Sequence, residues 1–294
     1  MSIRKRQLTG FLFFLPALIF FSSFVAYPFV RTVYLSFRDF NWFTKKDAFI
    51  GLQNYRDLLS SPQFLNALGN SIIYSVVSLA GQAVLAIIFA LLLNTKLHGS
   101  GLFRSLFILP WVLPTVVTAL AWQMMLHERW GAITYYLYTL GITAQRFPFL
   151  ATVSTALPTV ILVNIWRGYP LMMISFLSAL QAIPQELTEA AIIDGASTFK
   201  RTIYITLPII RNAIATIILF RAIWVFNFFD LTWQLTRGGP ASSTELLPIL
   251  IYKSAFGSYR FGEASAIAML MFMVLLILVM VYFRMNRSNE EELR

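Results

Sequence analysis

Six stretches of the chain are long and apolar enough to cross a lipid bilayer as helices, and they constrain the fold more than any other feature. A spanning helix needs about 20 apolar residues, and its backbone must satisfy its own hydrogen bonds within the hydrocarbon core. The uncharged run Leu8–Val30 is too long for the apolar core of a signal peptide, and no small-residue cleavage site follows it. We therefore expect a retained first span. The predicted spans cover about residues 9–34, 70–93, 105–126, 152–179, 208–230 and 262–283.

The composition agrees with a polytopic membrane protein. Hydrophobic residues make up 58% of the chain and charged residues only 12%, against about 25% charged in ordinary soluble domains. No change of composition marks a second domain, so we expect one all-α transmembrane domain over residues 1–294. Prolines within spans 3 and 4 predict kinked helices there. These prolines are Pro110, Pro114, Pro158 and Pro170.

The basic residues favour an orientation with both termini in the cytoplasm. Arg4-Lys5-Arg6 precedes the first span, and Arg284, Arg287 and Arg294 follow the last. The net charge of +10 is otherwise spread over the loops, so no nucleic-acid partner is expected. The predicted outer loops, near 37–68, 127–150 and 231–261, are rich in aromatic residues. They fit an interfacial aromatic belt, a docking platform for an external partner, or both.

Residues for catalysis or metal binding are missing from the sequence. The chain has no cysteine and only two histidines, His98 and His127, which fall in different loops. It has no phosphate-binding glycine loop, no nucleophile elbow and no pair of intramembrane carboxylates. Asp230 sits at the outer end of the predicted fifth span. We expect a non-catalytic subunit without a cofactor of its own, driven by energy from another chain.

The loop between spans 4 and 5, residues 181–207, carries a patterned set of polar and charged residues, whereas the rest of the second half of the chain is mostly apolar. A helix is expected to follow Pro184, and Gly195 can end it in a left-handed turn. Ser197 or Thr198 can then begin a second short helix. Such a helix pair could enter a groove on another protein, or lie on the membrane surface as a linker.

The spacing within this loop resembles the EAA motif of ABC-importer permeases. Glu189-Ala190-Ala191 is followed after three residues by Gly195, and then by Ile205-x-Leu207-Pro208. The resemblance implies a coupling helix that docks on a cytoplasmic ATPase dimer, which binds ATP and Mg²⁺. The implied docking residues are Glu189, Ala190, Ala191, Asp194 and Gly195.

Two further segments are similar to maltose-type, carbohydrate-uptake members of that family. They are Asn164-x-Trp166-x-Gly168-Tyr169-Pro170 before the loop and Arg237-Gly238-Gly239-Pro240 after span 5. The resemblance covers about residues 163–283. It implies a type I importer permease in the bacterial cytoplasmic (inner) membrane that moves a carbohydrate by alternating access. The implied partners are a second homologous permease subunit, the ATPase dimer and an extracytoplasmic solute-binding protein.

The same resemblance implies a set of substrate contacts on spans 4 and 5. Matching positions gives Asn164, Arg167, Gly168 and Leu171 on span 4, and Arg221, Val225 and Phe228 on span 5. Trp166 and Trp224 could stack on a sugar ring or on an arginine.

Two arginines among these positions suggest a sugar derivative with an acidic group. An intramembrane charge usually faces a cavity or a partner, and a guanidinium offers a planar fork for a carboxylate. In the alternative, Arg167 extends toward the membrane surface, and Arg221 pairs with Asp230 or with a neighbouring subunit.

Three other functions remain open from the sequence. The chain could belong to an importer for a different solute, such as a phosphodiester or a polyamine. It could be a stand-alone ion-coupled carrier or channel, which would transport without nucleotide. A membrane enzyme is the third, although no catalytic group supports it.

Overall fold

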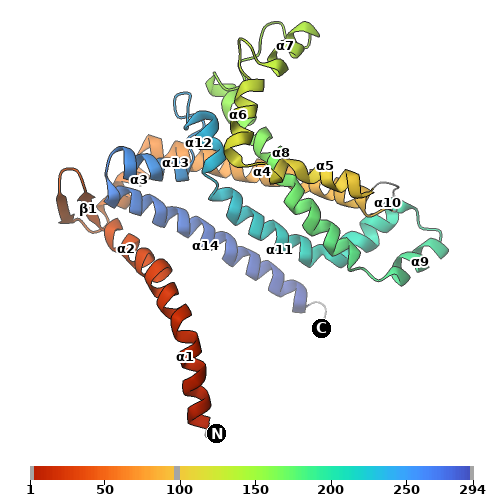
Figure 1. The fold of residues 1–294 in the computed structure, drawn as a ribbon, viewed down its shortest axis with the longest axis horizontal. Coiled ribbons are helices and arrows are strands. Elements are labelled where there is room, and N and C mark those ends of the chain that lie inside the picture. Colours follow the sequence, from red (N-terminus) through yellow and green to blue (C-terminus); the bar gives the residue numbers. More distant parts are fainter. Residues whose placement is uncertain (1–2, 96–99, 292–294) are drawn as a thin grey trace. The chain divides into compact units, whose positions relative to one another are not determined.

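The computed structural model describes residues 3–95 and 100–291, which form two compact units. The first unit runs to Leu65 and includes Leu250–Val274. The second comprises Asn66–Ile249 and the chain from Leu275 onward. Figure 1 shows the helices and strands of both units, coloured along the sequence.

The first unit starts with the predicted first span. Helix α1 (Ile3–Phe21) continues through a π-helical turn at Ser22–Ala26 into α2 (Tyr27–Ser36). Residues Phe13–Ser36 of this rod are long and apolar enough to cross a membrane, and they overlap the span expected at 9–34. The remaining elements of the unit are β1 (Arg38–Asn41), β2 (Lys46–Phe49), α3 (Gln53–Leu59), the start of α4 (Pro62–Leu93), the second half of α13 (Leu247–Tyr252), a π-helical turn (Lys253–Gly257) and the start of α14 (Phe261–Glu291).

A small β-hairpin follows the first span, although the sequence predicted only helices and loops. Strands β1 and β2 pair antiparallel, with Arg38 opposite Phe49. Ion pairs join Asp39 to Lys46 and Arg38 to Asp47 across the strands. The hydrogen bond from Arg38 to Asp47 raises the pKa of the Arg38 guanidinium. The hairpin is therefore a local addition to an otherwise helical fold.

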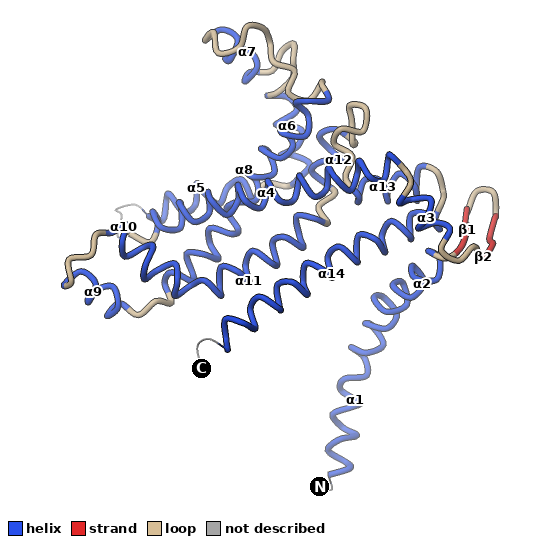
Figure 2. Tube along the Cα trace, turned by 180° about the vertical axis from the view of Figure 1, so that it is seen from behind, coloured by secondary structure: helices blue, strands red, loops and turns tan. Residues whose placement is uncertain are grey.

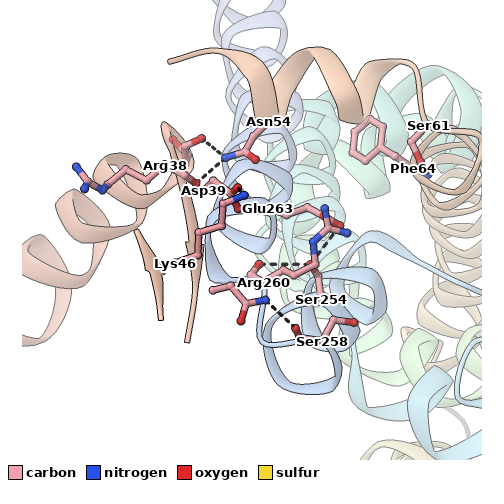
Figure 3. A network of polar contacts seen from close by, with 12 residues as sticks. Arg38, Asp39, Lys46, Asn54, Ser61, Phe64, Ser254, Ser258, Arg260 and Glu263 are labelled. Carbon is pink, nitrogen blue, oxygen red and sulfur yellow. Dashed lines mark hydrogen bonds and ion pairs between the residues drawn. The ribbon is translucent and has the colours of Figure 1, made fainter. Parts of the chain in front are cut away.

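Hydrogen bonds attach this hairpin to the residues that precede α14 (Figure 3). The Trp42 amide donates to the Tyr259 carbonyl at 3.1 Å, and Asn41 Nδ2 donates to the Ser258 carbonyl at 3.4 Å. On the other side, Asn54 Nδ2 donates to the Arg38 carbonyl at 2.9 Å. These bonds hold the hairpin against the segment before α14 and against α3.

The second unit holds the remaining helices. Its elements are most of α4, α5 (Ser100–Val112), α6 (Thr115–Met125), α7 (Ala132–Thr139), α8 (Val153–Gln181), α9 (Gln185–Ile193), α10 (Thr198–Arg201), a π-helical turn (Thr202–Thr206), α11 (Leu207–Phe226), α12 (Asp230–Thr236), the first half of α13 and the end of α14. Helix α8 is the most buried spanning helix and packs against both α5 and α11 (Figures 1 and 2). It lies at the centre of this unit.

The third predicted span, 105–126, is not one continuous helix. Helices α5 and α6 meet at an angle of 91° across Leu113 and Pro114. Proline lacks a backbone donor and disfavours helical geometry in the residue before it, so the helix breaks at this point. Among the described residues, five helices can span a membrane, and the count reaches six if this bent pair is one span.

Among the other boundaries that differ from the predicted ones, the end of α11 and the start of α4 have a local cause in the sequence. Helix α11 ends at Phe226, not at residue 230, because Asn227 caps it and Asp230 begins α12. An acid suits the positive end of a helix, and this favours a new start at Asp230. Helix α4 begins at Pro62, eight residues before the predicted residue 70, because uncharged polar residues such as Asn66 and Asn70 continue the helix beyond its apolar part.

Candidate functional site

A cleft of about 920 Å³ lies against α8 and α11 in the second unit. It contains the arginines that the sequence singled out on these two helices. The lining residues come from α5, α6, α8, α11, the short connection after α11 and the start of α12. They are Trp111, Thr115, Asn164, Arg167, Phe220, Arg221, Ile223, Trp224, Val225, Asn227, Phe228, Phe229 and Asp230.

Arg221 lies at the inner wall of this cleft and is held by a neutral side chain. Only 8% of the residue is exposed. Its Nε donates a 2.7 Å hydrogen bond to Oε1 of Gln82, which is completely buried on α4. Within the described chain Arg221 makes no ion pair. The alternative in which it pairs with Asp230 is therefore wrong.

Arg167 lies half-buried on α8 and turns into the same cleft. Its Nη2 donates to Oγ1 of Thr115 at 2.8 Å, and its guanidinium carbon lies 5.5 Å from the centre of the Phe228 ring. The latter distance is suitable for a cation–π contact. The alternative in which Arg167 extends outward to the membrane surface is wrong, because its head group faces protein.

Two further donors in this cleft are buried without an acceptor. They are Nδ2 of Asn164 and Nε of Arg167, neither of which has a hydrogen-bond partner among the residues described. A buried donor without an acceptor costs about 1–3 kcal/mol. The one carboxylate in the lining, Asp230, belongs to an exposed residue. The buried part of the cleft is thus rich in donors and positive charge, which suits an anionic or strongly accepting ligand.

The structure places the other expected contact residues in three different surroundings. Trp224, Val225 and Phe228 line the large cleft beside Arg221. Leu171 lines a neighbouring pocket of about 220 Å³, which Arg221 and Trp224 also line. Trp166 packs edge-on against Trp122, with ring centres 5.4 Å apart, and lies outside the cleft lining.

Gly168 faces protein and makes room for its neighbours. A Cβ at this position would collide with Nη2 of Arg221 and with the Gln82 carboxamide. Gly168 therefore permits the close approach of α4 and α11 to α8. The sequence prediction did not include Gln82, although it is the one amide in the uncharged run from Gly81 to Leu93 and could have been noticed for that reason.

The loop between α8 and α11 contains two short helices joined by a sharp turn. Helix α9 is capped by Asp194, and Gly195 has a left-handed backbone with φ of +74°. Ser197 Oγ then accepts a hydrogen bond from the Lys200 amide at 3.4 Å and caps α10. Glu189, Ala190, Asp194 and Gly195 are exposed, whereas Ala191 is buried.

Large apolar side chains are exposed around this turn. Ile193, at the end of α9, is 86% exposed, and Phe199 on α10 is also largely exposed. With the small and acidic residues of α9 they form a surface that suits a protein partner. We call the exposed residues Glu189, Ala190, Ile193, Asp194, Gly195 and Phe199 the coupling surface.

No metal centre is evident in the part of the chain that the structure describes. Groups of three or more histidine or acidic side chains that could hold an ion do not occur there.

Comparison with known proteins identifies the family. Residues 82–287 match the family described as binding-protein-dependent transport system inner membrane component. The trehalose/maltose transport system permease protein MalF of Thermococcus litoralis is 34% identical over 281 residues, which are 95% of this chain and 93% of that protein. The multiple sugar-binding transport system permease protein MsmF of Streptococcus mutans is 31% identical over 99% of this chain and all of that protein.

A solved structure has the same fold. The match is a chain of a bacterial ABC transporter involved in the import of the acidic polysaccharide alginate. It covers 97% of this chain and 96% of that one, with a TM-score of 0.84 and 25% identity. The chain described here belongs to the family of binding-protein-dependent transport system inner membrane components.

Proposed function

We propose that this chain is a permease subunit of an ATP-driven importer and that its cleft binds a carbohydrate with an acidic group. One observation carries the substrate class. Arg167 and Arg221 line a single cleft, and neither has an ion-pair partner among the described residues. Buried or half-buried guanidinium groups are stable only with a compensating anion or a polar cavity.

Further features of the cleft fit such a solute. The unpartnered Asn164 Nδ2 can donate to a hydroxyl or carboxylate oxygen. Trp111 and Trp224 present apolar surface, on which a sugar ring can pack. Two relatives are named as sugar permeases, and the structural neighbour imports an acidic polysaccharide. A carboxylated sugar combines these requirements.

The energy for transport comes from a separate ATPase dimer in this proposal. ATP and Mg²⁺ bind there, and Glu189, Ala190, Ala191, Asp194 and Gly195 form the docking segment. The family matched here is binding-protein-dependent, which supports a solute-binding protein as the source of the solute. A second homologous permease completes the pathway. Both termini then lie in the cytoplasm of a bacterial cell, on the same side as the coupling surface.

The chain offers a direct mechanical connection between these two sites. Helix α10 continues through the π-helical turn at Thr202–Thr206 into α11, the helix that carries Arg221. Helix α8, which carries Arg167, ends at Gln181, shortly before α9. A displacement of α9 and α10 would therefore move both arginines. This arrangement would let ATP-driven closure of the ATPase alter the cleft.

Transport by the reconstituted importer tests the proposal. Proteoliposomes would contain both permeases and the ATPase dimer, with the solute-binding protein outside and ATP inside. We expect ATP-dependent uptake of digalacturonate in preference to maltose. Arg221→Met should lower uptake of the diuronate by at least about tenfold, because one charged hydrogen bond contributes about 1.5–3 kcal/mol.

The control for this experiment is Arg211→Met. Arg211 is exposed near the start of the same helix and lies outside the cleft lining. Its loss should leave uptake close to that of the native chain. Unchanged diuronate uptake in Arg221→Met would refute the acidic-sugar assignment, whereas uptake without ATP or ATPase would refute the importer itself.

A guanidinium fork also binds phosphate, so a phosphodiester is the second candidate solute. Competition of glycerophosphodiester against digalacturonate in the same assay separates the two. A polyamine does not suit two facing arginines, because like charges repel each other.

A further inference from the structure

Gln82 connects three helices at the inner wall of the cleft. It lies on α4 and is 0% exposed. Its Oε1 accepts from Nε of Arg221 on α11 at 2.7 Å, and its Nε2 donates to the Asn164 carbonyl on α8 at 3.0 Å. Both ends of the carboxamide are therefore used, and each holds a different helix.

The surrounding structure is shaped to fit this carboxamide. Gly168 on α8 lies against both Gln82 and Arg221, and any side chain there would collide with them. The three residues form a close-packed group at the depth of the cleft. An arginine side chain has several rotatable bonds, so a fixed bond at Nε together with this packing restricts where its head group can lie.

The chemistry of an amide explains why this anchor suits an anion site. A glutamate at position 82 could also accept from Nε, but it would neutralise the guanidinium and compete with an incoming carboxylate. The neutral amide holds Arg221 without cancelling its positive charge. It also donates to the Asn164 carbonyl, which a carboxylate cannot do.

We propose that Gln82 is a positioning residue, which aims the Arg221 guanidinium at the acidic group of the transported solute. The inference rests on the proposed function and deepens it. Gln82 touches Arg221 and not the solute, and it sets how strongly the cleft prefers an acidic sugar over a neutral one. The preference therefore depends on α4, a helix that supplies none of the residues lining the cleft.

The test is a double-variant cycle on the assembled importer without nucleotide. Binding of digalacturonate and of maltose would be followed by tryptophan fluorescence, because Trp111 and Trp224 line the cleft. The variants are Gln82→Leu, Arg221→Met and the two combined. Gln82→Leu should weaken diuronate binding by about tenfold, because Arg221 loses its anchor. In the Arg221→Met background the same change should alter binding by less than about twofold, since coupled residues are non-additive.

Two single variants separate positioning from general stability. Gln82→Glu keeps an acceptor for Nε but neutralises Arg221 and loses the bond to the Asn164 carbonyl, so diuronate binding should fall more than maltose binding does. Ser78→Ala is the matched control. Ser78 is buried one turn earlier on α4, and its hydroxyl has no partner within the described chain. The Ser78→Ala importer should bind both solutes as tightly as the native importer does.

The outcomes distinguish this inference from the proposed function. If the native importer binds maltose better than the diuronate, the acidic-sugar assignment fails. The positioning role still stands in that case if Gln82→Leu weakens maltose binding only when Arg221 is present. If neither solute binds, the thermal unfolding midpoint is measured instead for the native importer, the two single variants and the double variant. Additive effects of Gln82→Leu and Arg221→Met on the binding affinity would overturn the inference. The same holds for additive effects on the unfolding midpoint if no solute binds. A Gln82→Leu variant with the affinity and selectivity of the native importer would also overturn it.

Discussion

Nη2 of Arg167 on α8 donates a 2.8 Å hydrogen bond to Oγ1 of Thr115, the first residue of α6. The 91° bend between α5 and α6 immediately precedes Thr115 and brings its hydroxyl to this position. The break at Pro114 thus has a local consequence, because it supplies a neutral acceptor that holds one arginine of the cleft. Arg167 and Arg221 are both anchored by uncharged side chains, Thr115 and Gln82, and both keep their charge available.

Removing the Thr115 hydroxyl should weaken recognition of an acidic solute. Thr115→Val keeps the shape of the side chain but removes the acceptor for Arg167. The loss of one hydrogen bond to a charged group is expected to cost about 1.5–3 kcal/mol, and part of this should appear as weaker diuronate uptake. Concentration dependence of uptake in proteoliposomes measures it. Thr118→Val is the control, since the Thr118 hydroxyl on the same helix has no partner among the described residues. Equal uptake by Thr115→Val and Thr118→Val would contradict the role given to Thr115.

Adding a methyl group at Gly168 should disrupt the packing of α4, α8 and α11. A Cβ there meets Gln82 and Arg221, so Gly168→Ala is expected to destabilise the permease by about 1–3 kcal/mol. Thermal unfolding of the purified importer measures the change. Gly69→Ala is the matched control, because it lies in α4 with no atom within 4 Å of its added Cβ. Alanine improves a helix interior by about 0.5–1 kcal/mol relative to glycine, so this variant should be neutral or slightly more stable. A Gly168→Ala variant as stable as Gly69→Ala would show that Gln82 and Arg221 do not pack closely against Gly168.

The left-handed turn between α9 and α10 should be sensitive to a side chain. Gly195 has φ of +74° and no atom within 4 Å of the position that a Cβ would take, so Gly195→Ala introduces backbone strain of about 1–2 kcal/mol without a clash. We expect slower ATP-dependent uptake, because the turn no longer presents α9 and α10 in the same geometry. Gly141→Ala imposes the same kind of strain in the loop after α7, where φ is +70° and space is equally open. That control should transport normally. Equal losses in the two variants would mean that strain alone, and not its place on the coupling surface, causes the defect.

A charge on the coupling surface should separate the permease from the proposed ATPase partner. Ile193 is 86% exposed at the end of α9. Ile193→Glu adds an uncompensated charge to a surface expected to be buried by the partner, and this should reduce co-purification of the ATPase by about tenfold or more. Ile142→Glu provides the comparison, because Ile142 is 66% exposed in the loop after α7. Retention of the ATPase by Ile193→Glu would place the docking surface elsewhere.

The helical membrane fold could be predicted because hydrophobic length is a strong and local signal. The apolar runs at Leu8–Val30 and near 262–283 reappear in the rod of α1 and α2 and in α14. The break in the third span was harder to predict from the sequence. Pro114 predicted a kink in this span. A proline alone does not determine the angle of a kink, because the angle also depends on how the following helix packs.

The candidate site was predictable in part. Arg167 and Arg221 could be identified from the sequence as candidate site residues, because charged side chains within membrane spans are rare and energetically costly. Their partners were not evident, since Gln82 and Thr115 lie 139 and 52 residues away from the arginines they hold. Contacts over such separations depend on helix packing. Gly168 fitted the pattern expected of a contact residue, but the structure gives it a packing role, because its position faces α4 and α11.

A structure of the assembled importer with digalacturonate trapped in the pathway would show whether the two arginines bind the acidic group of the solute. An ATPase variant that binds but does not hydrolyse ATP would hold the solute in the membrane subunits. We expect a uronate carboxylate within about 3 Å of guanidinium nitrogens of Arg167 and Arg221, with Arg221 still bonded to Gln82. A diuronate held only by its neutral hydroxyls, with both guanidinium groups turned away from it or paired with protein carboxylates, would rule out recognition of the acidic group by these arginines.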